Sequence, residues 1–482
     1  MIQRLKKFFK QDTDMTSGNL FWKIIVFALP IMLTTIMQLL YVTVDLTSVH
    51  YGDSAESMGA IASNSALIHL IVIVFAGISI GSNVILSEAK GAGNKDKADK
   101  VLHTSLFFAF ISGIVVGVIG FFISDNLLEL MGTEEHYFTK AALYLKIYFC
   151  GLPFLMIYNY SAQLLRAQGD SHSPFLALFI AGLCNIGFDL IFVFPLHMGV
   201  AGVALATIIA EAISGLICVL VLIFGKHNYV NFSFKKIDPK MPYLKEILRV
   251  GLPAGLQGFF FSLPNVFIQS SLYTIDPGNV NLENGANASS NIEGYFYAIV
   301  DSVGVATMTF IAANVGAKKA NNIKKSCLVG LFWGIIGSAI IALITAFLYR
   351  PLLSLFVTNE ESIEAGRTRL YIMGLFYGLD FTMNYTGHVL RGMKRSTYPM
   401  ITTLLSCTVL RIVLILTVFQ LPEFHTLIWL YALFPITWVI ATISNTVALI
   451  IFMPKDLRRL DEIAREKVPL EEGPSNQINI EE

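Results

Sequence analysis

The stretch SAQLLRAQGDSHSP, residues 161–174, decides the fold because it recurs in altered form as TGHVLRGMKRSTYP at residues 386–399. Each copy closes a long apolar run and leads into another one. Arg166 and Arg391 occupy the same place in the two copies. Because the second copy follows the first after nearly half the length of the chain, the repeat predicts two structurally similar halves.

Other segments repeat at almost the same spacing on either side of this pair. KGAGNK at residues 90–95 matches VGAKKA at 315–320, and ALPIML at 28–33 matches GLPAGL at 251–256. Each half therefore holds the same succession of apolar runs. An even number of spans returns the chain to the same side of the membrane, so the halves are parallel repeats related by an axis along the membrane normal.

The composition places these runs in a membrane. Of the 482 residues, 55% are hydrophobic and only 14% are charged, whereas a soluble domain has about 25% charged residues. Apolar stretches of about 20 residues, the length that an α-helix needs to cross a bilayer, recur along the chain. A transmembrane β-barrel would show alternating segments of about 10 residues instead. The predicted fold class is an all-α polytopic membrane protein.

Twelve transmembrane helices are predicted, in two six-helix bundles that form a parallel repeat. They cover roughly residues 20–47, 57–87, 101–123, 138–162, 174–196, 200–225, 247–273, 290–315, 326–348, 366–390, 398–420 and 425–453. The predicted division is an N-terminal lobe of residues 1–235, a C-terminal lobe of 236–455 and a polar cytoplasmic tail of 456–482, which we expect to be disordered.

Lys and Arg residues set the predicted orientation. With the N-terminus inside, most of the 34 Lys and Arg residues lie in the N-terminal segment, the cytoplasmic loops and the tail. The opposite loops are acidic, as in GDSAES at residues 52–57 and TNEESIEAG at 358–366. We therefore expect a multi-pass protein of the cytoplasmic (inner) membrane with both termini in the cytoplasm.

Several function classes are disfavoured. The formal net charge of +0 gives no sign of nucleic-acid binding. The five cysteines lie in apolar runs without metal-type spacing, no G-x-x-x-x-G-K-[ST] P-loop is present, and no H-E-x-x-H motif or other nucleophile–base constellation indicates catalysis. We expect a monomer that is not an enzyme, with no catalytic residues and no cofactor beyond a coupling ion.

Ionisable side chains inside the first-half spans are the strongest sign of function, because each costs about 2.5–3.5 kcal/mol on insertion scales. Helical spacing puts them on shared faces, and the predicted topology puts them in the outer half of the membrane. The candidates for cation or proton binding are Gln38, Asp45, Tyr144, Asn185, Asp189 and Thr207. For Glu211, one turn beyond Thr207, a functional and a structural role are equally open.

Two carboxylates with an amide and a hydroxyl group at one depth suit two kinds of coupling ion. Oxygen ligands favour a hard cation, so Na⁺ is one candidate, held by Asp45, Asn185, Asp189 and Thr207. Two neighbouring carboxylates also favour binding of a proton, which removes the repulsion between them. The sequence leaves Na⁺ and H⁺ both open.

The second half carries a different polar set. Its candidates for a substrate or coupling role are Asp380, Glu293, Asp301, Asn384 and Arg411. Arg411 is expected to neutralise one of these acids, and His388, near the cytoplasmic end of its span, is expected to be structural. Pro30 in the first span and Pro264 in the seventh are expected to bend their helices, either as static kinks or for gating.

Together these segments resemble the multidrug and toxic compound extrusion (MATE) family over roughly residues 20–453. The resemblance rests on LPIMLTTIMQLLYVTVD (29–45), GISIGSNVILSEAKGAGN (77–94), the repeated LLRAQGDSHSP and VLRGMKRSTYP segments, and GVAGVALAT (199–207). It implies two six-helix lobes in a V shape that exchange Na⁺ or H⁺ for organic cations. It also implies a first-lobe cation site at the six residues above.

Another branch of the family uses second-lobe acids, and Asp380 resembles its helix-ten aspartate. The seventh span here has only amides where that branch has an acid, which argues against a second-lobe cation site.

From the resemblance we expect an antiporter that exports organic, cationic drugs or toxic metabolites in exchange for Na⁺ or H⁺. The main alternative is a flippase of lipid-linked oligosaccharides or other lipids from the same superfamily, which would be expected to show a cavity rich in Lys and Arg. A channel is a further alternative, and it would differ from an antiporter by conducting ions without stoichiometric coupling.

Overall fold

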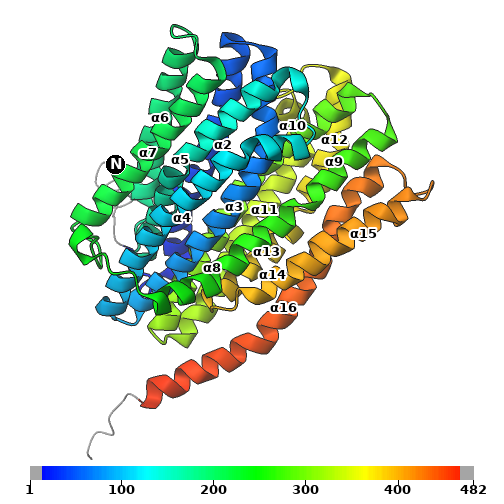
Figure 1. Cartoon of the computed structure of the whole chain (residues 1–482). Coiled ribbons are helices and arrows are strands. Elements are labelled where there is room, and N and C mark those ends of the chain that lie inside the picture. Colours follow the sequence, from blue (N-terminus) through cyan, green and yellow to red (C-terminus); the bar gives the residue numbers. More distant parts are fainter. Residues whose placement is uncertain (1–12, 467–482) are drawn as a thin grey trace, which may run out of the picture.

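The computed structural model describes residues 13–466, and this part of the chain is helical without strands (Figure 1). The first half contains α2 (Leu20–Gly52), α3 (Ala55–Gly91), α4 (Lys95–Leu130), α5 (Glu135–Ala167), α6 (His172–Val193) and α7 (Gly199–Phe224). The second half contains α8 (Met241–Ser262), α9 (Pro264–Ile275), α10 (Val280–Gly316), α11 (Ala320–Leu353), α12 (Glu360–Leu375), α13 (Tyr377–Gly392), α14 (Thr397–Thr403), the π-helix η2 (Leu404–Leu410), α15 (Arg411–Leu416) and α16 (Leu427–Glu466). Two 3-10 turns, η1 (Phe234–Lys236) and η3 (Val418–Gln420), lie in connections.

Ten candidate spans among the described residues are long and apolar enough to cross a membrane, so the predicted fold class is confirmed. The seventh and tenth predicted spans are each built from two shorter helices, α8 with α9 and α12 with α13. The first break follows from Pro264, which begins α9 and has no N–H to continue the bonding of α8. The second break falls at Phe376, where no proline marks it. Pro30, by contrast, lies inside an unbroken α2.

The two halves meet through a few helices. α3 packs against α8 and α10 of the other half, and α2 packs against α10 and α11. Glycines allow the closest approach, with Gly81 of α3 against Gly251 of α8 and Gly91 of α3 against Ala313 of α10. A Cβ atom at Gly81 or Gly91 would overlap backbone atoms of the facing helix, so small residues set the distance between the halves.

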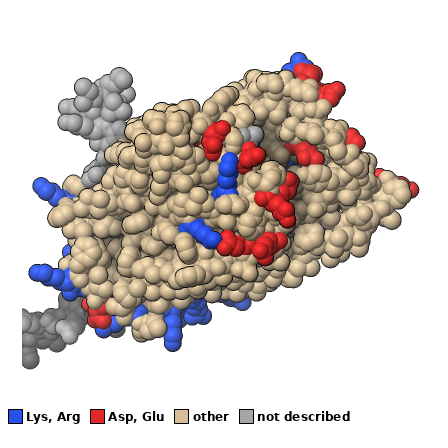
Figure 2. All heavy atoms as spheres, turned by 45° about the horizontal axis from the view of Figure 1, so that its top comes forward, with Lys and Arg blue, Asp and Glu red and all other residues tan. Residues whose placement is uncertain are grey.

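Charged side chains separate toward opposite ends of the bundle. Figure 2 shows Asp and Glu side chains gathered over its right half and Lys and Arg side chains mainly along the left and lower edges. Basic residues at the acidic end have acidic partners, such as Lys140 with Glu56 at 3.6 Å and Lys146 with Asp125 at 2.7 Å. This separation is what a fixed orientation in a membrane requires. The basic end is called the cytoplasmic end below, in keeping with the predicted orientation.

The last helix extends further than predicted. α16 continues to Glu466, so residues 456–466 of the expected disordered tail are helical. Arg395, in the loop after α13, holds this part of α16 through two hydrogen bonds of 2.7 Å to Asp456. This tertiary contact stabilises turns whose composition alone indicates a solvated tail. The rest of the predicted tail lies outside the described residues.

Candidate functional site

Three helices of the first lobe bring four of the predicted polar residues together. Asp45 lies in the second half of α2, Asn185 and Asp189 lie one turn apart on α6, and Thr207 lies on α7. The Thr207 hydroxyl lies 3.1 Å from Oδ2 of Asp45 and 3.0 Å from the Val203 carbonyl oxygen, so its one proton serves either acceptor. The Asp189 carboxyl and Asn185 amide groups both lie beside the Asp45 carboxyl group.

This first-lobe cluster, Asp45, Asn185, Asp189 and Thr207, is buried and short of hydrogen-bond donors. Asp45 is 6% exposed and Asp189 is 0% exposed. Among the described residues, Oδ1 of Asp45, both carboxyl oxygens of Asp189 and Oδ1 of Asn185 find no partner. Burying an unpaired carboxylate costs several kcal/mol, so two side by side require a proton or a cation.

The oxygen-rich donor set suits a proton or Na⁺ rather than a transition metal. Within residues 13–466, no group of three or more His, Cys, Asp and Glu side chains is placed to hold a metal ion. The first-lobe cluster instead offers two carboxylates, an amide oxygen and a hydroxyl oxygen. These are the hard donors that alkali and alkaline-earth cations prefer. The residues present therefore fit a Na⁺ ion as well as a proton.

The other two predicted first-lobe residues lie at the margin of this cluster. Tyr144 of α5 is buried among apolar residues of α2, α6 and α7, and its ring stacks on Tyr148 with a centroid distance of 6.3 Å. Gln38 is exposed and makes no hydrogen bond to another described residue. Its neighbour on the same face, Tyr41, donates to the Leu178 carbonyl of α6 at 2.6 Å. Tyr41 therefore fixes α2 against α6 below Asp45.

Glu211 interacts electrostatically with the cluster. It is half-buried, one turn beyond Thr207 on α7. Its charge acts on Tyr144, and the charge of Asp45 acts on it. A third acid near two carboxylates adds to the negative potential that attracts a cation.

A buried ion pair occupies one second-lobe candidate. Glu293 of α10 accepts hydrogen bonds from Nε and Nη2 of Arg369 of α12, at 2.7 and 3.0 Å. Arg369 is 9% exposed, and its guanidinium lies 5.6 Å from the centroid of the Tyr431 ring. Glu293 is thus already neutralised and joins α10 to α12. Arg369 could not be recognised from the sequence, because a basic residue in the first turns of a span resembles one that reaches the membrane surface.

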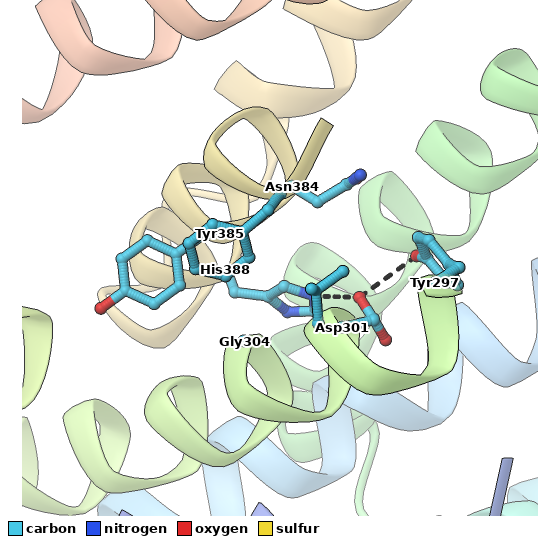
Figure 3. A pocket seen from close by; sticks show the side chains of 8 residues that line it. Tyr297, Asp301, Gly304, Asn384, Tyr385 and His388 are labelled. Atoms are coloured by element: carbon cyan, nitrogen blue, oxygen red, sulfur yellow. Dashed lines mark hydrogen bonds and ion pairs between the residues drawn. The ribbon is translucent and has the colours of Figure 1, made fainter. Parts of the chain in front are cut away.

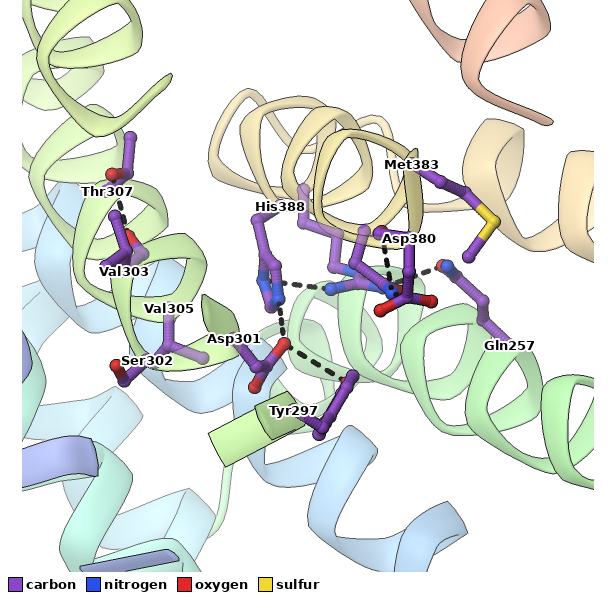
Figure 4. Close-up of polar contacts among 12 residues, drawn as sticks. Gln257, Tyr297, Asp301, Ser302, Val303, Val305, Thr307, Asp380, Met383 and His388 are labelled. Atoms are coloured by element: carbon purple, nitrogen blue, oxygen red, sulfur yellow. Dashed lines mark hydrogen bonds and ion pairs between the residues drawn. The ribbon is translucent and has the colours of Figure 1, made fainter. Parts of the chain in front are cut away.

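A chain of hydrogen bonds crosses α10, α13 and α8 (Figures 3 and 4). The Tyr297 hydroxyl donates to Oδ1 of Asp301 at 3.1 Å, and Nε2 of His388 lies 2.8 Å from the same oxygen. Arg391 lies 3.0 Å from Nδ1 of His388 and donates to Gln257 at 2.7 Å. Figure 3 shows Tyr297, Asp301 and His388 around one pocket between α10 and α13.

Arg411, which was expected to neutralise one of the second-half acids, makes no direct ion pair with Asp380, although its charge acts on that carboxyl group. Asp380 of α13 is 2% exposed and accepts a hydrogen bond from Asn384 at 3.2 Å, and its Oδ2 has no partner among the described residues. Arg411, fully buried, donates to Thr437 at 2.7 Å and lies 4.2 Å from the centroid of the Phe434 ring. In residues 13–466, no Asp or Glu lies within ion-pair distance of it. The π-helix η2, which precedes Arg411, shifts the register of the helix and turns this side chain toward α16.

Comparison with known proteins identifies relatives over most of the chain. The MatE family model matches residues 30–191 and 244–417. The probable multidrug resistance protein YoeA of Bacillus subtilis is 29% identical over 357 residues, which cover 72% of this chain and 75% of that protein. The FAD transporter of Shewanella oneidensis is 24% identical over 331 residues, which cover 67% of this chain and 72% of that protein.

A solved structure shares the fold. The outward-facing conformation of a multidrug resistance MATE family transporter matches with a TM-score of 0.80 and 23% identity, covering 92% of this chain and 97% of that one. At this identity the match establishes the fold alone. Each segment matched by the family model contains one copy of the internal repeat, in agreement with two similar halves.

Proposed function

The chain belongs to the MatE family, and on this premise we propose that it is a secondary antiporter that exports small organic cations in exchange for Na⁺ or H⁺. The relative named as a multidrug resistance protein supports an efflux role, and the long apolar helices support a membrane setting. The coupling ion binds at the first-lobe cluster. The exporter works as a monomer in the cytoplasmic membrane, with both termini inside.

One observation carries the proposal: two buried carboxyl groups lie side by side without a cationic partner among the described residues. The Thr207 hydroxyl and the Asn185 amide lie beside the Asp45 carboxyl group, but no Lys, Arg or His side chain of the described residues forms an ion pair with Asp45 or Asp189. A bound proton or Na⁺ removes this cost. An exchange cycle needs a site that is alternately filled and emptied by the coupling ion. Here, binding of one proton or Na⁺ changes the charge of the lobe by one unit, which can be coupled to a change of conformation.

Ion binding drives the cycle through α2. Neutralising Asp45 changes the interactions of its carboxyl group with α6 and α7, so α2 can change its packing against these two helices. Pro30 cannot donate to the preceding turn, so α2 has a weak point on the cytoplasmic side of Asp45. The ion transduces a gradient only if it binds one conformation of α2 more tightly than the other.

A second candidate function, transport of an anionic substrate, is supported by the environment of Arg411. Nε and Nη1 of Arg411 have no hydrogen-bond partner among the described residues, although the side chain is fully buried. Guanidinium groups bind phosphate and carboxylate strongly. An anionic substrate, such as a pyrophosphate-linked lipid or a flavin nucleotide, would match this group, and one relative is named an FAD transporter.

Transport by the purified protein in liposomes tests the proposal. We expect a fluorescent organic cation to move when either a Na⁺ gradient or a pH gradient is imposed, and the Asp45→Asn variant to lose that movement. Asp125→Asn, a change at a partly exposed acid of α4 that pairs with Lys146 outside the first-lobe cluster, serves as the matched control and should retain it. Absence of gradient-driven movement of several cations would contradict the proposal, and movement of a flavin nucleotide would then support the anionic substrate.

A further inference from the structure

His388 sits between an acid and a guanidinium in an arrangement that fixes its protonation. Nε2 lies 2.8 Å from the Asp301 carboxylate, and Nδ1 lies 3.0 Å from a nitrogen of Arg391. Arginine is always a donor, so Nδ1 accepts that hydrogen bond and carries no proton. Nε2 therefore carries the single proton and donates it to Asp301. In this conformation His388 is neutral, Asp301 is ionised and Arg391 is cationic.

The first lobe fills the equivalent place with neutral side chains. The repeat that aligns Arg166 with Arg391 also aligns Gln163 with His388. Gln163 accepts a hydrogen bond from Asn83 at 2.8 Å, and both side chains are buried. A buried amide pair thus satisfies this position of the fold. The acid and the histidine in the second lobe are therefore not a requirement of the architecture.

The charged groups around His388 determine what a second proton would do. The titratable and charged side chains around it are Tyr297 and Asp301 on α10, Asp380, Tyr385 and Arg391 on α13, and Arg166 on α5, whose charge acts on Asp301. A proton on Nδ1 would turn an acceptor into a donor that faces the donor groups of Arg391. Arg391 would then have to leave, and Asp301 would remain as the counter-ion of the imidazolium.

We propose that Asp301 and His388 form a second proton-binding site, separate from the first-lobe cluster, and that proton binding there detaches Arg391 from Gln257. The inference rests on the proposed function, because it gives this site a part in the transport cycle. Figure 4 shows Gln257 on the far side of the network from Asp301.

Release of Gln257 reaches the contact between the lobes. Gln257 is buried on α8 two residues beyond Gly255, which packs against the backbone of α3 at Val74. Arg391 is the side chain that ties this part of α8 to α13. When it leaves, α8 is free to change its packing on α3, and the lobes change their relative position.

Distances between spin labels test the site without relying on transport. Labels at Lys95 on α4 and Lys324 on α11, two exposed positions in different lobes, are introduced in a background without native cysteines, and the protein is placed in lipid nanodiscs. The pH is varied from about 8 to about 5, the range over which histidine titrates. We expect the distance distribution to change with acid in the wild type. His388→Gln, which installs the side chain of the first lobe, should keep the neutral-pH distribution. In the Asp45→Asn, Asp189→Asn background, where the first-lobe cluster has no carboxyl group left to titrate, His388→Gln should abolish the acid change.

Three further variants make the result specific. Asp301→Asn removes the anion beside the imidazole, so the midpoint of the acid change should move down by about one to three pH units. His69→Gln alters another histidine within a span, on α3, and should behave as wild type. The double variant Asp45→Asn, Asp189→Asn should keep the His388-dependent change.

The outcomes separate this inference from the proposed function. An acid change that His388→Gln leaves unaltered in the Asp45→Asn, Asp189→Asn background, or an equal loss in His69→Gln, overturns the second site even when liposome transport is intact. A His388-dependent change in a protein that moves no cation in liposomes supports the site and removes the antiport proposal. If His388→Gln fails to fold, the shifted midpoint of Asp301→Asn decides, and an unshifted midpoint overturns the site.

Discussion

Lys394, in the loop after α13, donates to both carboxylate oxygens of Glu88 at the end of α3, at 2.9 Å each. Glu246 at the start of α8 accepts from Lys394 at 3.3 Å and from Lys97 of α4 at 2.9 Å. Because α3 and α4 belong to the first lobe and α8 and α13 to the second, these four charged residues join the lobes at the cytoplasmic end. Any opening at this end has to break the contact.

Replacing Lys394 by Gln is expected to favour an opening at the cytoplasmic end. The Lys394 side chain is 34% exposed, so solvent screens the pair, and its loss is worth about 1 kcal/mol, or roughly a five-fold change in population. Distances between spin labels on α4 and α11 measure this population. Lys100→Gln removes an exposed ion pair with Asp96 within α4 and should leave the distances unchanged. Equal effects of the two changes would contradict the prediction.

The contribution of Glu246 to stability should depend on pH. Burial by itself would raise the pKa of Glu246, but the hydrogen bond and charge of Lys97 and the charge of Lys394 outweigh it and hold the pKa below its ordinary value. A lowered pKa means stabilisation that is present above the ordinary pKa of the carboxyl group and is lost as the pH falls through the lowered pKa. Thermal unfolding of the wild type and Glu246→Gln should therefore differ at neutral pH and converge in acid. A difference that stays constant in acid would rule this out.

At high pH, the stabilisation by this contact is expected to be lost through deprotonation of Lys394. Burial would lower the pKa of this ammonium group, but Glu88 and Glu246 raise it overall. The resulting stabilisation is present below the ordinary lysine pKa and is lost as the pH rises through the raised pKa. The contact between the lobes is therefore strongest at pH values between the lowered pKa of Glu246 and the raised pKa of Lys394.

Gly81→Ala is expected to disturb the contact between α3 and α8. Alanine normally stabilises a helix by about 0.5–1 kcal/mol relative to glycine. At Gly81 the added Cβ would overlap the Ile247 carbonyl oxygen, so a cost of about 1–3 kcal/mol should outweigh that gain. Gly187→Ala on α6 is the matched control, because nothing lies within 4 Å of its Cβ position. Thermal unfolding in detergent should show a loss for Gly81→Ala alone.

Much of the fold could be predicted because it rests on period and composition. Apolar runs of span length and the repeat around Arg166 and Arg391 indicate two similar halves without any knowledge of contacts. The break at Phe376, the π-helix before Arg411 and the extension of α16 to Glu466 could not be predicted. The break lies between Gly374 and Gly378, but glycines are common in membrane helices and do not by themselves mark a break. The π-helix and the extension of α16 depend on contacts with other helices.

The candidate sites show the same division. Asp45, Asn185, Asp189 and Thr207 could be grouped from the sequence, because helical spacing fixes their faces and topology fixes their depth. Which helices face one another is a tertiary property. For that reason Arg369, rather than Arg411, emerged as the partner of an acid only when α12 was seen against α10.

Glu293→Gln is expected to destabilise the second lobe by about 3–5 kcal/mol, because it leaves the buried guanidinium of Arg369 unpaired. Arg369→Met leaves the Glu293 carboxylate unpaired and should cost a similar amount. The double variant Glu293→Gln, Arg369→Met removes both charges and should cost clearly less than the sum of the single changes. A double-mutant cycle by thermal unfolding measures this coupling. Additive losses would show that the two residues do not act as a pair.

Thr207→Val is expected to reveal the coupling ion by the sign of its effect. The Thr207 hydroxyl lies 3.1 Å from Oδ2 of Asp45 and has lone pairs of its own. If Na⁺ is the ion, valine removes an oxygen ligand, and half-maximal transport should need several-fold more Na⁺. If H⁺ is the ion, valine removes a donor that favours the ionised carboxylate, so half-maximal transport should move to higher pH. Thr207→Ser keeps the hydroxyl and should resemble the wild type, whereas a Thr207→Val variant with unchanged dependence on both ions would place ion binding elsewhere.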